Sequence, residues 1–289
     1  MGRLRPPNVH GLAVVDKPAG VTSHDVVGML RRRFDERQVG HAGTLDPDAT
    51  GVLLVGVGRC TRLLRFLTDL GKTYTAEIVF GTATDTLDSS GMVTATYEMT
   101  DLSPELVRRM VAERLTGEIL QVPPMVSALK VDGRRLHELA REGIEVERVA
   151  RPVTVRRFEI EPTADPLVYR TEVECSKGTY VRTLADDLGR HCGGGAHLRA
   201  LRRTAVGGFT VAEAAPPDEV RLLTLAEALR DYEAVSVSEE TAALVRNGRV
   251  LERFVGDGPW AVLGPDGVLL AVYERHGRAE AKPAVVVAG

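Results

Sequence analysis

The stretch GHAGTLDPDATGVL, residues 40–53, is the most informative part of this chain. It places one acid, Asp46, in a loop punctuated by glycine and proline, and the apolar run 52–57 that follows predicts a buried strand. Pro47 favours an extended backbone at the residue before it. We therefore expect a stiff loop that holds the Asp46 carboxylate at the edge of a sheet, where reactive groups often lie. An Asp-Pro pair is also a common structural turn, and the loop alone favours that simpler interpretation.

The composition of the chain is that of an ordinary globular protein. Its 289 residues, 44% hydrophobic and 27% charged, can bury a sizeable core without metal or disulfide staples. The three cysteines are widely spaced and form no CxxC pair, so the sequence suggests neither a zinc site nor a disulfide framework, and it predicts no metal and no cofactor. We expect a cytoplasmic protein that does not enter a membrane, because no apolar run is long enough for a signal core or a span.

The charged residues are segregated along the chain, although the formal net charge is only −3. Residues 1–34 carry six Lys or Arg against two Asp or Glu, and residues 177–203 carry the same numbers. Residues 130–158 carry eight against five, whereas residues 211–245 carry two against eight. Basic faces of this kind can follow the phosphates of a nucleic acid, but solvated helix faces would give similar counts.

Periodicity and turn signals predict an α+β fold with two domains. Strands are expected at 11–16, 52–57, 74–80 and 168–175, and helices after Thr22 or Ser23, from Ser103-Pro104, over 180–191 and from Pro216-Pro217. Residues 121–152 have little apolar periodicity and a short basic helix around 133–141, which suggests a semi-detached insertion. A helix at 238–247, a hairpin at 260–263 and 268–273 and a last strand at 284–288 predict a small β-rich C-terminal domain. The expected domains are 1–233, with the insertion at about 121–152, and 234–289.

Six motifs in order, from about residue 10 to 210, resemble those of one family. The stretch 40–53 is similar to the catalytic-aspartate motif of pseudouridine synthases, in the form found in the TruB family of tRNA pseudouridine-55 synthases. The other motifs are DKPAGVTS (16–23), GKTY with GTATDTLD (71–74 and 81–88), QVPPMVSALK (121–130), SKGTYVRTL (176–184) and AHLRALRR (196–203). The chain lacks the long basic extensions of the guide-RNA-dependent relatives, so it resembles the stand-alone bacterial type.

The resemblance implies both a fold and an activity. The fold would be a mixed, mainly antiparallel sheet flanked by helices, with an RNA-gripping insertion and a small PUA-like C-terminal domain. The activity would be isomerisation of uridine to pseudouridine at position 55, in the T loop of tRNA, after the base is flipped out of its stack. The implied partner is the T arm of tRNA, and we expect a monomer that requires no protein partner.

The resemblance also implies roles for single residues. Asp46 would be the nucleophile, acting covalently, and Arg182 would pair with it, lowering the pKa of the carboxyl and orienting it. Tyr74 would stack on the uracil or transfer a proton. His41 would contact the RNA beside the flipped nucleotide, and Tyr180 and Leu201 would line the base pocket.

Each of these residues also has an ordinary structural interpretation when the residue pattern is taken alone. Arg182 could be an exposed arginine at a helix start, and Tyr74 a strand tyrosine packed in the core. Tyr180 could be a helix-start aromatic, Leu201 a leucine on a helix face, and His41 a turn cap or a surface residue in a loop.

Basic side chains in the insertion and elsewhere are candidates for phosphate contacts, which carry no sequence information. The candidates are Lys130, Arg134, Arg135 and Arg141 in the insertion, together with Arg31–Arg33 and Arg199–Arg203, Arg202 included. Val126, Val131 and His137 stand where the family commonly has aromatics, so stacking by the insertion stays open. Gly133 and Gly143 could let the insertion hinge when RNA binds.

Two other classes of function remain as alternatives. One is an RNA-binding or RNA-folding protein with secondary catalysis, or a guide-RNA-dependent relative. The other is an Asp-dependent hydrolase, for which the sequence offers no general-acid or metal-ligand constellation.

Overall fold

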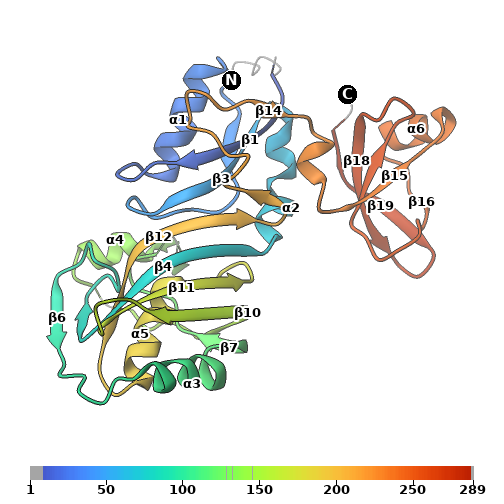
Figure 1. Ribbon diagram of the computed structural model, residues 1–289. Helices are drawn as coiled ribbons and strands as arrows, with labels where there is room; N and C mark the ends of the chain where they lie inside the picture. Colours follow the sequence, from blue (N-terminus) through green and yellow to red (C-terminus); the bar gives the residue numbers. More distant parts are fainter. Residues whose placement is uncertain (1–8, 128, 132, 145, 288–289) are drawn as a thin grey trace.

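The computed structural model describes residues 9–127, 129–131, 133–144 and 146–287, and its fold is α+β, as predicted (Figure 1). A ten-stranded sheet runs through the larger part of the molecule in the order β14-β1-β3-β12-β4-β11-β10-β7, with β2 attached to β3 and β13 to β12. All neighbours are antiparallel except β3 and β12, which are parallel. The strands are β1 (Gly11–Lys17), β2 (Val39–His41), β3 (Thr50–Val57), β4 (Lys72–Phe80), β7 (Gly117–Gln121), β10 (Arg151–Pro162), β11 (Val168–Cys175), β12 (Ala196–Val206), β13 (Phe209–Thr210) and β14 (Leu222–Leu223).

Three helices pack on this sheet through apolar sides that the sequence predicts. They are α1 (Ser23–Arg33), α3 (Pro104–Arg114) and α5 (Val181–His191), and their buried residues share one core with β1, β3, β4 and β11. Thr22 caps α1 in a capping box with Asp25, and Ser103 caps α3 ahead of Pro104. These helix starts therefore follow from local sequence.

The β7–β10 connection carries the predicted insertion. Its backbone forms β8 (Lys130–Val131), β9 (Arg134–Arg135) and the short helix α4 (Leu136–Arg141), which is shorter than the predicted helix. Gly133 and Gly143 flank α4 at φ +83° and +70°, backbone conformations that favour glycine. A second small hairpin, β5 (Thr82–Thr84) and β6 (Val93–Thr96), follows β4.

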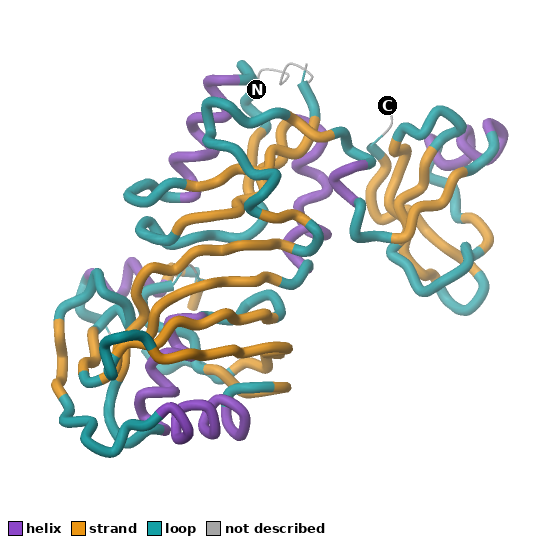
Figure 2. Tube along the Cα trace, in the orientation of Figure 1, coloured by secondary structure: helices purple, strands orange, loops and turns teal. Residues whose placement is uncertain are grey.

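The C-terminal part is a separate five-stranded sheet, as Figures 1 and 2 show. Its order is β15-β17-β18-β19-β16, and helix α6 (Glu239–Arg246), capped by Ser238, packs on it. The strands are β15 (Glu233–Ser236), β16 (Leu251–Glu252), β17 (Trp260–Leu263), β18 (Leu269–His276) and β19 (Glu280–Val286). The prediction that this region is rich in β-strands is confirmed.

Helix α2 (Leu64–Asp69) follows the 3-10 turn η1 (Gly58–Leu63) and packs where the two sheets meet. Phe66 of α2 packs in one apolar cluster with Ala261 and Val272 of the C-terminal sheet. The Tyr232 hydroxyl donates a hydrogen bond to the Phe66 carbonyl at 2.8 Å, and Arg65 pairs with Glu274 at 2.8 Å. The C-terminal unit is therefore packed against the segment that leads into β4.

Two sequence-based expectations about local structure are wrong. Leu201 does not lie on a helix, because residues 196–206 form β12, with a register shift beside Ala200, whose φ is +54°. No helix begins at Pro216-Pro217, where the chain makes only a turn and then pairs β14 with β1. Paired prolines suit either a helix start or a turn, and here pairing at the edge of the sheet decides between them.

Candidate active site

Asp46 lies in the loop between β2 and β3, and this loop is fastened to the segment around the start of α1. The Ser23 hydroxyl donates to the Leu45 carbonyl at 3.0 Å and accepts from the Leu45 N–H at 2.8 Å. The Gly20 N–H donates to the Pro47 carbonyl at 3.0 Å. Hydrogen bonds on both sides of Asp46 therefore fix the loop, as the Asp-Pro motif predicts.

Two buried cations hold the same loop from beneath. Lys17 is fully buried and donates from Nζ to the carbonyls of Pro18, Val21 and Pro47 at 2.7–2.8 Å, and burial lowers its pKa to about 8. Arg203 donates from Nε to the Val52 carbonyl at 2.7 Å and from its guanidinium to the Gly43 carbonyl at 3.2 Å. The loop carbonyls of Pro47 and Gly43 thus accept from positive donors that are also bonded to the β1–α1 connection and to β3, which stabilises a fixed loop shape.

Sheet register places Arg203 between the loop and Tyr74. Across β3-β12-β4, Gly51 lies opposite Arg203, and Arg203 lies opposite Tyr74. Gly51 has φ +100°, and a Cβ there would stand 2.1 Å from the Arg203 carbonyl oxygen, so only glycine allows this approach. Arg203 is 1% exposed and its guanidinium donates to backbone carbonyls, so the structure adds no support to its prediction as a phosphate contact. No local pattern distinguishes Arg203 from Arg199 and Arg202, which are more exposed than Arg203.

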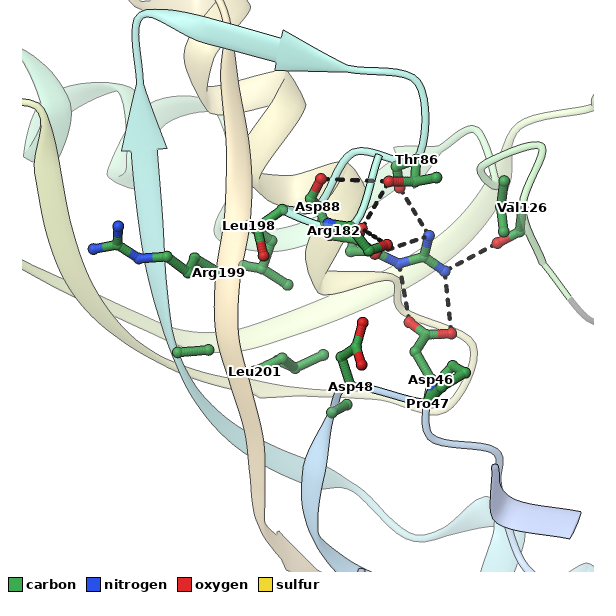
Figure 3. Close-up of a pocket in the computed structure, with 14 residues that line it drawn as sticks. Asp46, Pro47, Asp48, Thr86, Asp88, Val126, Arg182, Leu198, Arg199 and Leu201 are labelled. Carbon is green, nitrogen blue, oxygen red and sulfur yellow. Dashed lines mark hydrogen bonds and ion pairs between the residues drawn. The ribbon is translucent and has the colours of Figure 1, made fainter. Parts of the chain in front are cut away.

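Arg182, in the first turn of α5, meets Asp46 as predicted (Figure 3). Its Nε lies 3.0 Å from one carboxylate oxygen, and a second guanidinium nitrogen donates to the other at 3.3 Å. The same guanidinium donates to the carbonyls of Thr86 and Val126 at 2.8 and 2.9 Å and lies 3.6 Å from a carboxylate oxygen of Asp88. Its side chain is only 4% exposed, which excludes the interpretation as a solvent-facing arginine.

The electrostatic balance at Asp46 differs from the expectation in one respect. Arg182 does favour the charged carboxylate, but burial is the larger effect and raises the pKa of Asp46 above its ordinary value, with Asp88 adding to the rise. Asp88, which sequence reasoning left without a role, lies in the β5–β6 loop and accepts from the hydroxyls of Thr86 and Ser90 at 2.7 and 2.6 Å. Two carboxylates thus share one buried guanidinium.

Two cavities flank the Asp46–Arg182 pair, and Leu201 lines both of them together with that pair. The first, the Tyr180 cavity, has a volume of about 390 Å³ and is lined by Tyr74 and Tyr180 among others. The second, the Asp48 cavity, has a volume of about 220 Å³ and is lined by Asp48, Asp88 and Leu198 (Figure 3). The structure therefore brings Asp46, Tyr74, Tyr180, Arg182 and Leu201 together, from motifs up to 155 positions apart in the sequence.

The two tyrosines are held differently. Tyr74 is buried in β4, and burial raises the pKa of its phenol while the neighbouring Arg203 acts in the opposite direction. Tyr180 precedes α5, and its backbone N–H donates to the Gln121 side chain at 2.8 Å. Both rings line the Tyr180 cavity, so the cavity has aromatic surfaces suited to a planar ligand.

His41 lies on β2, opposite Val55, and not in a loop. It is half-buried, and burial and the charge of Arg203 lower its pKa. It is not among the residues that line the two cavities. The structure therefore places His41 beside the site and not in it.

Most of the predicted phosphate contacts that the structure describes have protein partners. Arg202 makes two hydrogen bonds to the Asp16 carboxylate, at 3.0 and 2.8 Å. Arg199 pairs with Glu77, Arg134 pairs with Glu142, and Arg31 and Arg33 donate to the carbonyls of Val39 and Val220. The side chains of Lys130, Val131, Arg135, His137 and Arg141 lie outside the described residues.

No group of three or more His, Cys, Asp or Glu side chains that could hold a metal ion occurs within residues 9–127, 129–131, 133–144 and 146–287. Over the same ranges, no helix is both long enough and apolar enough to cross a membrane.

Replacing Lys17 with methionine is expected to lower the free energy of unfolding by about 2–4 kcal/mol, because three loop carbonyls lose a charged donor in a buried position. Thermal or denaturant unfolding measures this change. Lys282→Met, at an exposed position of β19, is the matched control and should stay within about 0.5 kcal/mol of the wild type. Equal stability of the two variants would contradict the role of Lys17 in fixing the loop.

Comparison with known proteins identifies the class to which this fold and site belong, that of the pseudouridine synthases. The model of the TruB family pseudouridylate synthase N-terminal domain matches residues 31–181, and models of tRNA pseudouridine synthase C-terminal domains match residues 182–252 and 232–288. Curated proteins named tRNA pseudouridine synthase B are similar over almost the whole chain. The protein from Corynebacterium aurimucosum is 48% identical over 93% of each chain, and that from Mycolicibacterium paratuberculosis is 47% identical over 98% of each.

The chain belongs to the TruB family, and it is an enzyme of the isomerase class that forms pseudouridine. Solved structures of more distant proteins agree on the fold. A Cbf5-Nop10-Gar1 complex matches with a TM-score of 0.73 and 22% identity, and an H/ACA RNP bound to a substrate RNA containing 2'-deoxyuridine matches with 0.71 and 20%. Each match covers 96% of this chain and 84% of the other.

Proposed function

We propose that this enzyme converts uridine to pseudouridine at position 55, in the T loop of tRNA, with Asp46 as the nucleophile. Relatives of 43–48% identity are named tRNA pseudouridine synthase B, which supports tRNA as the substrate. The observation that carries the mechanism is the Asp46–Arg182 ion pair, which stands between two cavities and beside two tyrosines.

The Tyr180 cavity suits a flipped uracil. Tyr74 and Tyr180 offer aromatic surfaces for stacking, and Leu201 adds apolar surface to the same cavity. Extruding a base costs a few kcal/mol, and stacking in the cavity offsets part of that cost. A pyrimidine in this cavity brings its glycosidic bond close to the Asp46 carboxylate.

Asp46 acts as the covalent nucleophile in this proposal, since an ionised carboxylate can attack and a neutral acid cannot. Arg182 favours the ionised form against the effect of burial and aims both oxygens. In the overall reaction the N1–C1′ bond breaks and a C5–C1′ bond forms, while a proton leaves C5 and N1 gains one. The atoms therefore balance without a further reactant, and the phenol of Tyr74 is placed to move a proton within the site.

We also propose the bounds and roles of the domains. Residues 1–233 would form the catalytic domain and residues 234–289 a PUA-like domain, which the separate C-terminal sheet supports. The insertion at about 121–152, with Lys130, Arg134, Arg135 and Arg141, would contact phosphates of the T arm. The enzyme would act as a monomer without a guide RNA. Its relatives named tRNA pseudouridine synthase B match along 92% or more of their own length.

Incubation of the purified chain with a T-arm stem-loop, followed by chemical mapping, tests this proposal. Pseudouridine is expected at position 55 alone, and a stem-loop with cytidine at that position should yield none. Binding of RNA without product would favour the RNA-folding alternative. Product that requires an added guide RNA would favour the guide-dependent alternative, and product at other loop uridines would contradict the assigned position.

A further inference from the structure

The Tyr180 cavity has an outer lobe that the chemistry at Asp46 does not use. Besides the residues around Asp46, the cavity is lined by residues from the end of α2, the start of β4 and the turn before α5. We call this part the outer lobe, and its residues are Thr68, Lys72, Ser176, Lys177, Gly178 and Thr179. Hydroxyl groups, a glycine turn and two lysines are the groups with which proteins hold oxyanions.

Lys72 is the buried cation of the outer lobe. Its side chain is 6% exposed, and Nζ donates to the carbonyls of Thr68 and Leu70, both at 2.6 Å. An ammonium has three donors, and within the described ranges Lys72 makes these two hydrogen bonds and no ion pair. Burial lowers the pKa of Lys72 to about 8, so an anion in the cavity would stabilise its charged form.

The mouth of the outer lobe is formed by the turn at residues 176–179. Lys177 pairs there with Asp69 at 2.6 Å, and both side chains are more than half exposed, so this pair can exchange for another anion at little cost. Gly178 adopts φ +83°, which turns the backbone ahead of α5. No acceptor in the described part of the chain is assigned to the backbone N–H groups of residues 177–179.

The two cavities beside Asp46 differ sharply in charge. The Asp48 cavity is lined by three carboxylates, Asp46, Asp48 and Asp88, against two arginines. Among the residues that the structure describes, the Tyr180 cavity is lined by a single carboxylate, Asp46, against four cations, Lys72, Lys177, Arg182 and Arg203. The Tyr180 side of the Asp46–Arg182 pair is therefore electrostatically more favourable for a phosphate than the other side.

We propose that the outer lobe binds a phosphodiester of the RNA strand, next to the nucleotide whose base lies at Asp46. Lys72 supplies its third donor, and Lys177 exchanges Asp69 for the phosphate. A base held in the Tyr180 cavity brings its own sugar-phosphate link into the same space, so one anchor fixes the strand and the reacting ring together. This inference rests on the proposed function, because it takes RNA as the ligand of the cavity.

Substitution of single phosphodiesters by neutral methylphosphonates in the T-arm stem-loop, combined with Lys72→Met, tests the proposal. For the wild type, one neutral link beside position 55 should weaken binding on the order of tenfold, as for a charge-assisted hydrogen bond. Lys72→Met should weaken binding of the normal RNA to a similar degree and be less sensitive than the wild type to that same link, where the contact of Lys177 remains. Its affinity should also fall less steeply with salt, by about one unit of slope.

Independent effects would overturn the proposal. If the loss of RNA affinity in Lys72→Met multiplies with the loss caused by the neutral link at every position, the two act independently. Lys72 then only caps the end of α2. If Lys72→Met fails to fold, Lys177→Gln at the exposed mouth carries the same test at the same link. Asp69→Asn should raise affinity by removing the competing anion, and a loss of affinity would count against the exchange.

Two further controls separate this proposal from the proposed function. Lys282→Gln, on β19 and away from the cavity, should respond to each neutral link as the wild type does. Mapping of pseudouridine in the wild-type reactions reports on the function itself. If Lys72→Met and one neutral link have coupled effects on affinity but no pseudouridine forms, the phosphate site is supported and the proposed reaction is wrong. If pseudouridine forms but no link is coupled to Lys72, the proposed reaction is supported and the phosphate site is wrong.

Discussion

Replacing Asp46 with asparagine is expected to abolish pseudouridine formation and to leave RNA binding nearly unchanged. The substitution preserves the size of the side chain and the loop bonds made by Leu45 and Pro47, but it removes the charged nucleophile. Loss of a covalent nucleophile typically costs roughly 10⁴-fold or more in turnover. Single-turnover mapping of pseudouridine in a T-arm stem-loop, with RNA affinity measured in parallel, gives both quantities.

Asp48→Asn is the matched control for this substitution. Asp48 lies two residues further along the same loop, is exposed and does not pair with Arg182. Its turnover should stay within the same order of magnitude as the wild type. If Asp46→Asn formed product as fast as Asp48→Asn, the role assigned to Asp46 could not stand.

Substitution of Arg182 by lysine is the second change with a large expected effect. A lysine offers a point charge and cannot span the Asp46 carboxylate and the carbonyls of Thr86 and Val126 at once. Turnover should fall about 10²- to 10³-fold, the scale on which loss of one preorganised donor acts. The affinity for RNA should change little, because the buried guanidinium is directed at the protein and not at solvent.

Arg190→Lys, two turns along the same helix, is the control, because Arg190 is exposed and pairs with Asp186, away from Asp46. A charge-removing variant, Arg182→Gln, adds a pH test with a definite sign. Arg182 lowers the pKa of Asp46 against the effect of burial, so its removal raises that pKa further. As the pH falls, the rate of the variant should begin to decline at a higher pH than that of the wild type. An unchanged acidic limb would remove the electrostatic part of the argument.

Local sequence signals predicted the fold well wherever one segment supplies its own evidence. Thr22 and Ser103 cap helices as expected, and β3 follows the Asp46 loop as a buried strand that is apolar from Gly51 onward. The errors fall where a distant strand decides. No helix begins at Pro216, because the segment that follows it pairs with β1 as an edge strand. The segment around Leu201 forms β12, because it pairs with β3 on one side and with β4 on the other.

The residues of the candidate site also fall into those that the sequence predicted and those that the structure revealed. The six motifs identified Asp46, Tyr74, Tyr180, Arg182 and Leu201, and the structure gathers them around two cavities. They did not identify Asp88 as a second partner of Arg182, nor Lys17 and Arg203 as the cations beneath the loop. Charged side chains at these positions look exposed in a sequence, because exposure is their usual state.

By itself the sequence determined the Asp-Pro loop, the helix starts, the apolar strands and the residues able to react, since each depends on neighbours within a few positions. Only the tertiary structure decided the electrostatics. Arg182 reaches Asp46 across 136 positions, and Arg203 reaches Gly43 across 160. Burial of these groups is a property of the assembled sheet, so the raised pKa of Asp46 and the positive lobe around Lys72 exist only once distant segments exclude water from the same space.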